Sequence, residues 1–172
     1  GNGGAQGGSG LCDYGTFQTL VAAEGLPAED VDALVLHEIA HLFFFGSSPV
    51  RMPDWYAEGF AESFGGQGTF TWDGKKLGIG GPMRRDRIDA MKQAPLPLRD
   101  LLAGNAEQLL AIDHARGMRF YAQCWALQRW LLLPSNPYRE RFLAWEDECR
   151  SAMPGVQSTR SFGDGAPATA AF

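Results

Sequence analysis

The sequence predicts an α+β domain that is mostly helical. Three observations support this fold class: a long apolar run at residues 31–45, several further stretches compatible with helices, and only two segments with the composition of β-strands. The apolar side chains of residues 31–45 cover nearly every face of a helix, which predicts that this helix is buried centrally. With 172 residues, 45% of them hydrophobic, the chain is long enough for one globular domain with a real core.

A strand and then the central helix are expected first along the chain. Residues 14–21 have the β-branched and aromatic character of a strand. Leu26-Pro27 predicts a turn, and the acidic side chains within residues 29–32 put negative charge in the first turn of the helix, where the helix dipole favours it. Gly46 is expected to end this helix.

A second helix is expected at residues 54–64, with Pro53 at its start and Asp54 as its N-cap. Residues 69–79 predict a β-hairpin whose two strands are joined by a two-residue turn at Asp73-Gly74. Further helices are expected near residues 83–93, 97–110, 117–133 and 136–152.

Both ends of the chain have the composition of loops. The N-terminus begins GNGGAQGGSG and the C-terminus ends GDGAPATAAF, and such sequences are flexible. The expected organisation is a flexible segment at residues 1–12, a folded domain at residues 13–160 and a loop-like tail at residues 161–172. Ends of this kind are typical of a piece of a longer polypeptide.

Charge and hydropathy exclude two classes of partner. The net charge of −5 argues against a nucleic-acid-binding surface. No apolar run is long enough for a transmembrane segment, and the N-terminus lacks the pattern of a signal peptide.

Cysteine usage leaves the compartment open. Cys124 lies among apolar residues and is expected to be a buried thiol. Cys12 and Cys149 either form a disulfide, which would indicate an oxidising compartment, or are thiols as well. Of the possible locations, an extracytoplasmic or secreted one is expected.

The candidate chemistry lies in His37-Glu38-Ile39-Ala40-His41, an H-E-x-x-H motif inside the apolar helix. Residues four apart lie on one face of a helix, so His37 and His41 can aim their imidazoles at one Zn²⁺ ion. Glu38 lies beside that ion, where its carboxylate can take a proton from zinc-bound water. Burying these polar groups without partners is costly, and a metal ion removes that cost.

A third ligand is expected because catalytic zinc usually takes three protein ligands and leaves the fourth position to water. Glu58 lies 17 residues after His41, on a helix expected to fold back against the first. Glu62, one turn further on the same face, is placed to accept the free ring N–H of a ligating histidine. The alternative interpretation is a chance motif whose histidines pack in the core, with Glu58 as a solvated surface charge.

The sequence HEIAH followed by WYAEGFAE resembles the gluzincin metallopeptidases, whose third zinc ligand is a glutamate on a downstream helix. The phrase at residues 55–61 is similar to the ligand helix of the aminopeptidase N and leukotriene A4 hydrolase branch. Residues 30–133 are closer still to the small bacterial peptidase MA-like domains, in which a helix beginning Tyr-Ala-Gln follows a short hairpin. In this chain the beginning of that helix corresponds to Tyr121-Ala122-Gln123.

The resemblance implies a gluzincin-like catalytic core, with a zinc helix, a ligand helix and a small β-hairpin or edge strand, in residues 13–160. It assigns one Zn²⁺ ion to His37, His41 and Glu58. It assigns the catalytic base to Glu38 and the outer acidic position to Glu62.

Tyr121 is the candidate for stabilising the oxyanion, because a tyrosine about this far past the glutamate ligand has that role in the aminopeptidase N branch. It lies 63 residues after Glu58. Packing in the core is the alternative for this side chain. His114 is expected on the surface and is the other proton donor if Tyr121 points away. The arginines within residues 84–87 are expected to form a solvated helix face.

The implied function is a zinc-dependent metallopeptidase acting on a peptide or protein substrate. The chain lacks the Gly-x-Met-Glu-Asn element of the aminopeptidases, so the resemblance does not support aminopeptidase activity. Two alternatives stay open: a catalytically silent binding domain stapled by zinc, and a zinc hydrolase acting on a non-peptide bond. If residues 14–21 form an edge strand beside the zinc helix, an extended peptide can pair with it.

Overall fold

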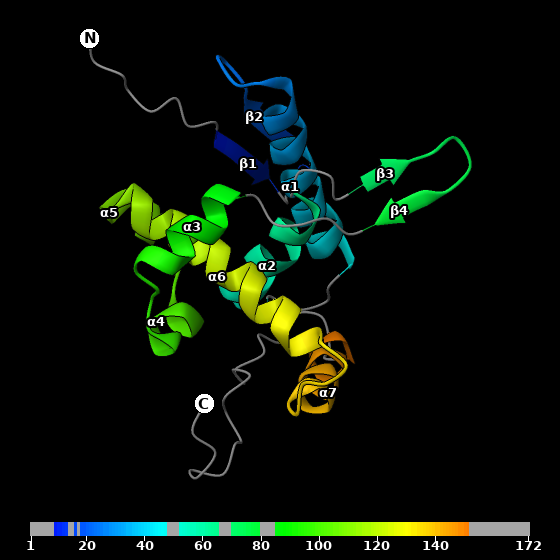
Figure 1. Ribbon diagram of the computed structural model, residues 1–172, viewed down its shortest axis with the longest axis vertical. Helices are drawn as coiled ribbons and strands as arrows, with labels where there is room; N and C mark the ends of the chain where they lie inside the picture. Colours follow the sequence, from blue (N-terminus) through cyan, green and yellow to red (C-terminus); the bar gives the residue numbers. More distant parts are fainter. Residues whose placement is uncertain are drawn as a thin grey trace.

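The computed structural model describes residues 9–13, 16, 18–47, 52–65, 70–79 and 85–151. This part of the chain is mostly helical with two small β-hairpins, which confirms the predicted α+β class (Figure 1). In chain order the elements are β1 (Ser9–Asp13), β2 (Gln18–Ala22), α1 (Ala28–Ser47), α2 (Asp54–Phe64), β3 (Phe70–Trp72), β4 (Leu77–Ile79), α3 (Arg85–Gln93), α4 (Leu98–Ala103), α5 (Ala106–Ile112), α6 (His114–Leu132) and α7 (Arg139–Ser151). None of the helices described here is long and apolar enough to cross a membrane.

Helix α2 occupies the centre of the fold, because it packs against both α1 and α6. Helices α3 and α5 pack on α6, and α7 lies near the C-terminal end of α6 (Figure 1). The antiparallel pair β1–β2 packs against α1, whereas the pair β3–β4 projects from the helical body (Figure 1). The H-E-x-x-H segment of α1 is therefore flanked by β1–β2 and by α2.

The core is built from large side chains of α2, α6 and α7. Trp55 of α2 is 1% exposed, and Phe120 and Phe142 are fully buried. The rings of Trp55 and Trp145 stack with centroids 5.9 Å apart, which joins α7 to α2. Burying a side chain of this size stabilises the fold by about 1.5–3 kcal/mol, so these contacts hold α2 firmly in place.

A glycine sets the distance between α2 and α6. A Cβ atom at Gly59 would lie 2.7 Å from the backbone oxygen of Cys124, closer than any real side chain approaches. The two helices therefore touch backbone to backbone at this point, next to Glu58. Cys124 is a buried free thiol, as predicted.

Helix α1 is less buried than its apolar sequence predicts. Ala33, Ala40 and Phe44 are buried, but Ile39 is 49% exposed and Phe43 is 68% exposed. The prediction of burial on every side is wrong for these two residues, because α2 and β1–β2 cover the other faces of the helix.

Several predicted boundaries in the first half of the chain are wrong. Residues 9–13 form strand β1 although their composition indicates a flexible segment. Strand β2 covers 18–22 and so extends one residue beyond the predicted strand at 14–21, of which residues 14, 15 and 17 lie outside the described part of the chain. Residues 9–13 form a strand because they pair with Gln18–Ala22, and the composition of residues 9–13 alone does not predict this pairing. Helix α1 continues through Gly46 to Ser47. The rest of the predicted N-terminal segment (residues 1–8), the end of the predicted domain (152–160) and the predicted tail (161–172) lie outside the described residues.

Helix starts and turns differ from the prediction for local reasons. Helix α2 covers the predicted residues 54–64, but Pro53 is its N-cap, and Asp54 accepts a hydrogen bond from Asn105 instead. The loop between β3 and β4 has four residues, 73–76, because the Asp73 side chain accepts the N–H groups of Lys75 and Lys76. The predicted helix 97–110 is divided into α4 and α5, where the Asn105 side chain caps α5.

Candidate metal centre

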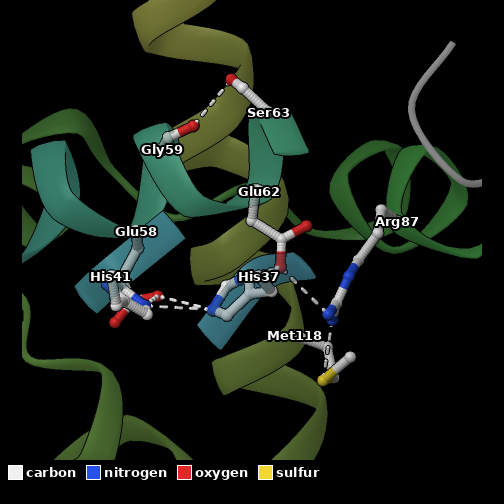
Figure 2. Close-up of polar contacts among 8 residues, drawn as sticks. All are labelled: His37, His41, Glu58, Gly59, Glu62, Ser63, Arg87 and Met118. Atoms are coloured by element: carbon white, nitrogen blue, oxygen red, sulfur yellow. Dashed lines mark hydrogen bonds and ion pairs between the residues drawn. The ribbon is translucent and has the colours of Figure 1, made fainter. Parts of the chain in front are cut away.

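Three side chains of α1 and α2 converge on one point. His37 and His41 are one turn apart on α1, and their Nε2 atoms lie 3.1 Å from each other. Glu58 of α2 places its Oε2 atom 3.2 Å from Nε2 of His41 and 3.4 Å from Nε2 of His37 (Figure 2). The three side chains offer one ligand atom each, so this group could hold a metal ion.

Helix packing explains why the three atoms meet. The spacing of four residues puts both imidazoles on one face of α1, and that face is turned to α2. Near the end of α2, a Cβ atom at Gly65 would lie 3.0 Å from Cβ of His37, so the two helices also approach closely there. The site therefore needs only two helices that are adjacent in the sequence.

Glu62 lies behind His37. Its Oε1 atom is 3.5 Å from Nδ1 of His37, and its side chain is 8% exposed. A carboxylate at this position favours the tautomer of His37 that carries its proton on Nδ1, which leaves the lone pair of Nε2 facing Glu58 and His41. Nδ1 of His41 is buried and has no hydrogen-bond partner among the described residues.

The charges of the three side chains shift the pKa values of Glu58 and His37 in opposite directions. Burial works against ionisation of Glu58, but the hydrogen bonds and charges of His37 and His41 outweigh it and lower the pKa of Glu58 to about 2. Burial also works against protonation of His37, but the hydrogen bond to Glu58 and the nearby carboxylates raise its pKa. The site therefore favours positive charge between the imidazoles and Glu58, as a cation-binding site does.

Glu38 lies next to this group on α1 and is 6% exposed. Burial raises its pKa, against the opposing charges of His37 and His41. A carboxylate with a raised pKa is a better proton acceptor near neutral pH. Strand β1 covers the Glu38 carboxylate, because a Cβ atom at Gly10 would lie only 2.6 Å from Cγ of Glu38.

Aromatic rings of α6 and α1 flank the two histidines. The ring of Tyr121 meets that of His37 edge to face, with centroids 6.0 Å apart. Phe45 stacks on His41 with centroids 6.0 Å apart. Burial raises the pKa of Tyr121, so its hydroxyl keeps its proton and can act as a donor. His114 is exposed, at the first residue of α6.

Arg87 of α3 contacts Glu62 at the site, and the sequence did not predict this contact. It was expected on a solvated helix face, but its side chain is 15% exposed and its Nη2 atom lies 3.1 Å from Oε1 of Glu62 (Figure 2). One signal in the sequence could have found it. A carboxylate placed behind a ligating histidine in an apolar setting needs a positive partner, and the arginines within residues 84–87 are near in the sequence.

Comparison with models of known protein families gives no match for the chain. Comparisons with curated proteins and with solved structures give no significant match either.

Proposed function

We propose that the protein is a zinc-dependent metallopeptidase of the gluzincin type. The observation that carries the proposal is the spacing of the three ligand atoms of His37, His41 and Glu58. Ligands about 2.1 Å from a tetrahedral zinc ion lie about 3.4 Å apart, and the three observed separations are 3.1, 3.2 and 3.4 Å. Two imidazole nitrogens and one carboxylate oxygen are also a donor set of catalytic zinc sites.

The neighbouring residues suit peptide hydrolysis. A zinc ion held there would supply Lewis acidity and lower the pKa of a water molecule to about 7. Glu38 is the base that takes the proton of the attacking water and then passes it to the amine of the leaving group. The Tyr121 hydroxyl donates a hydrogen bond to the carbonyl oxygen as that oxygen becomes negative. Glu62 keeps the His37 ring in the tautomer that ligation needs.

The position of β1 supports a peptide substrate. In the described part of the chain β1 pairs with β2 alone, so it is an edge strand, and its Gly10 lies against Glu38. An extended peptide that adds to this edge brings its backbone past the proposed base. The strand with this role is β1 at residues 9–13, whereas the sequence suggested residues 14–21.

The test compares the wild-type protein with Glu38→Gln, which keeps the shape of the side chain but not its basicity. Elemental analysis measures bound zinc, and digestion of a mixed peptide library measures cleavage. We expect one zinc ion per chain in both proteins and cleavage by the wild type alone, with activity lost upon treatment with a chelator. Glu29→Gln, an exposed glutamate of the same helix, is the matched control and should cleave as the wild type does.

Each other outcome selects a different function. Bound zinc without cleavage of the library, of esters or of epoxides indicates a binding domain that zinc staples together. Cleavage of esters or epoxides but not of peptides indicates a zinc hydrolase of another bond. Equal cleavage by Glu38→Gln and wild type would refute the proposed mechanism.

A further inference from the structure

The structure places one cation, Arg87, between two groups of the proposed site that come from different helices. From α3, its Nη2 atom lies 3.1 Å from Oε1 of Glu62 on α2. Its guanidinium carbon lies 5.4 Å from the ring centroid of Tyr121 on α6. Its Nη1 atom lies 3.0 Å from the sulfur of Met118, also on α6 (Figure 2).

Glu62 needs this cation because its carboxylate is nearly buried. Its side chain is 8% exposed, and its Oε1 atom faces both Nδ1 of His37 at 3.5 Å and Nη2 of Arg87 at 3.1 Å. The N–H of a neutral imidazole does not neutralise a buried carboxylate, whereas a guanidinium does. Without Arg87, the buried Glu62 carboxylate would lose its counter-charge, and its side chain would turn towards water and away from Nδ1 of His37.

The contacts on α6 fix the guanidinium itself. Packing over the Tyr121 ring limits its rotation, and the contact with Met118 holds the second amino group. The guanidinium in this position is also attracted by the negative face of the Tyr121 ring. The contacts with α6 therefore fix the position of the Arg87 side chain, which in turn holds the Glu62 side chain of α2.

We infer that Arg87 is a positioning residue of the metal centre, which holds Glu62, and through it the His37 ring, in the orientation that metal binding needs. The inference rests on the proposed zinc site. It assigns Arg87 no contact with substrate, so its effect should appear first in the affinity of the metal-free protein for zinc and second in turnover.

An ordinary structural ion pair is the alternative, and the chain offers a matched example. Arg119 of α6 is also partly buried, at 20% exposure, and its Nη2 atom lies 3.5 Å from Asp113. That pair is formed with the N-cap residue of α6 and includes none of the proposed site residues. Arg119→Met therefore removes an ion pair of a partly buried arginine, whose partner Asp113 is 49% exposed, without changing any of the residues proposed to hold the metal ion.

The experiment measures the zinc affinity of metal-free proteins by competition with a chelator of known affinity. We expect Arg87→Met to weaken zinc binding by about 10-fold or more, the size of effect typical of outer partners of metal ligands. Arg87→Lys keeps the charge but loses the planar fork, so it should fall between wild type and Arg87→Met. Arg119→Met should bind zinc as the wild type does, although thermal unfolding will show that both variants are less stable.

A double-variant cycle separates positioning from general destabilisation. If Arg87 acts through Glu62, then Arg87→Met should change zinc affinity by less than about twofold once Glu62→Gln is present. Full additivity of the two substitutions, or equal zinc affinity in Arg87→Met and Arg119→Met, would overturn the inference. If Arg87→Met fails to fold, the comparison between Arg87→Lys and the wild type decides in the same way.

Failure of the inference and failure of the proposed function are distinguishable. A wild-type protein that binds no zinc refutes both. A wild-type protein that binds zinc without cleaving peptides refutes the peptidase but leaves the affinity series to decide the role of Arg87. For an active enzyme, the expected change in Arg87→Met is a lower kcat with little change in KM.

Discussion

Gly10 of β1 lies directly against the Glu38 side chain of α1, so that a methyl group at residue 10 would meet the carboxylate arm. The two residues are 28 positions apart in the sequence. They meet because β1–β2 packs on the face of α1 that carries Glu38. A glycine at this point lets an edge strand pass close to the proposed base without displacing it.

The first prediction concerns this contact. In Gly10→Ala, the flexible Glu38 side chain is the part that moves, because the added methyl would lie 2.6 Å from its Cγ atom. A displacement of this kind is expected to lower kcat/KM by about 100-fold. Zinc content should stay at the wild-type value. Ala22→Ser, an exposed change on the paired strand, is the control, and an equal loss in both variants would contradict the prediction.

The second prediction concerns Glu58, the proposed metal ligand on α2. Glu58→Gln keeps the size of the side chain but removes the charge that pairs with both histidines. Zinc affinity should fall by more than about 100-fold, beyond the effect of losing an outer partner. Zinc at 100 times its Kd should stabilise the wild type by about 2.7 kcal/mol and stabilise Glu58→Gln hardly at all.

Thermal unfolding with and without zinc measures this difference. Glu140→Gln, a change at a side chain that is 86% exposed, serves as the control and should respond to zinc as the wild type does. Equal stabilisation of Glu58→Gln and wild type would remove Glu58 from the metal centre.

The third prediction is a dependence of stability on pH in the metal-free protein. The pKa of Glu58 is lowered from 4.5 to about 2, so the unfolded chain binds its proton more readily than the folded chain does. Stability from this group is therefore fully present above pH 4.5 and is lost as the pH falls towards 2. The amount is on the order of 3 kcal/mol. Urea unfolding of the wild type and of Glu58→Gln between about pH 2 and pH 6 measures this contribution to the free energy of unfolding. Parallel curves of unfolding free energy against pH for the two proteins would refute the prediction.

The fourth prediction tests the hydroxyl of Tyr121. Tyr121→Phe keeps the ring that packs on His37 and under Arg87 but removes the donor. We expect kcat to fall by about 100-fold, as when one oxyanion donor is removed, with zinc affinity unchanged. Tyr138→Phe, which alters a tyrosine packed on Trp130, is the control. Unchanged kcat in Tyr121→Phe would assign this ring to packing alone.

The sequence predicted the helices of the site best, because their signals are local. The repeat of apolar residues and the Pro53 start predict the bounds of α2, and a four-residue spacing on a helix is enough to bring His37 and His41 together. The distance of 17 residues between His41 and Glu58 fits two adjacent helices, and the structure brings these residues to 3.2 Å. The proposed roles of these residues remain predictions.

The remaining features depend on contacts between distant segments. Strand β1 contains Ser9, Gly10 and Asp13, which have weak intrinsic preference for a strand, and it forms through pairing with β2 and packing on α1. Arg87 belongs to a charged helix whose sequence indicates a solvated face. Its burial depends on how α3 packs on α6 near Glu62, which no local pattern encodes.

The close approach of α2 to α6 at Gly59 has a consequence for how the protein opens. With α1 on one side and α6 on the other, the amide groups of α2 can exchange with deuterium only when most of the domain comes apart. The slowest exchange in the chain should therefore occur in α2, and a bound metal ion should slow α1 and α2 together while leaving α7 at its own rate. Any cation held between these helices thus protects the same segment that supplies its third ligand.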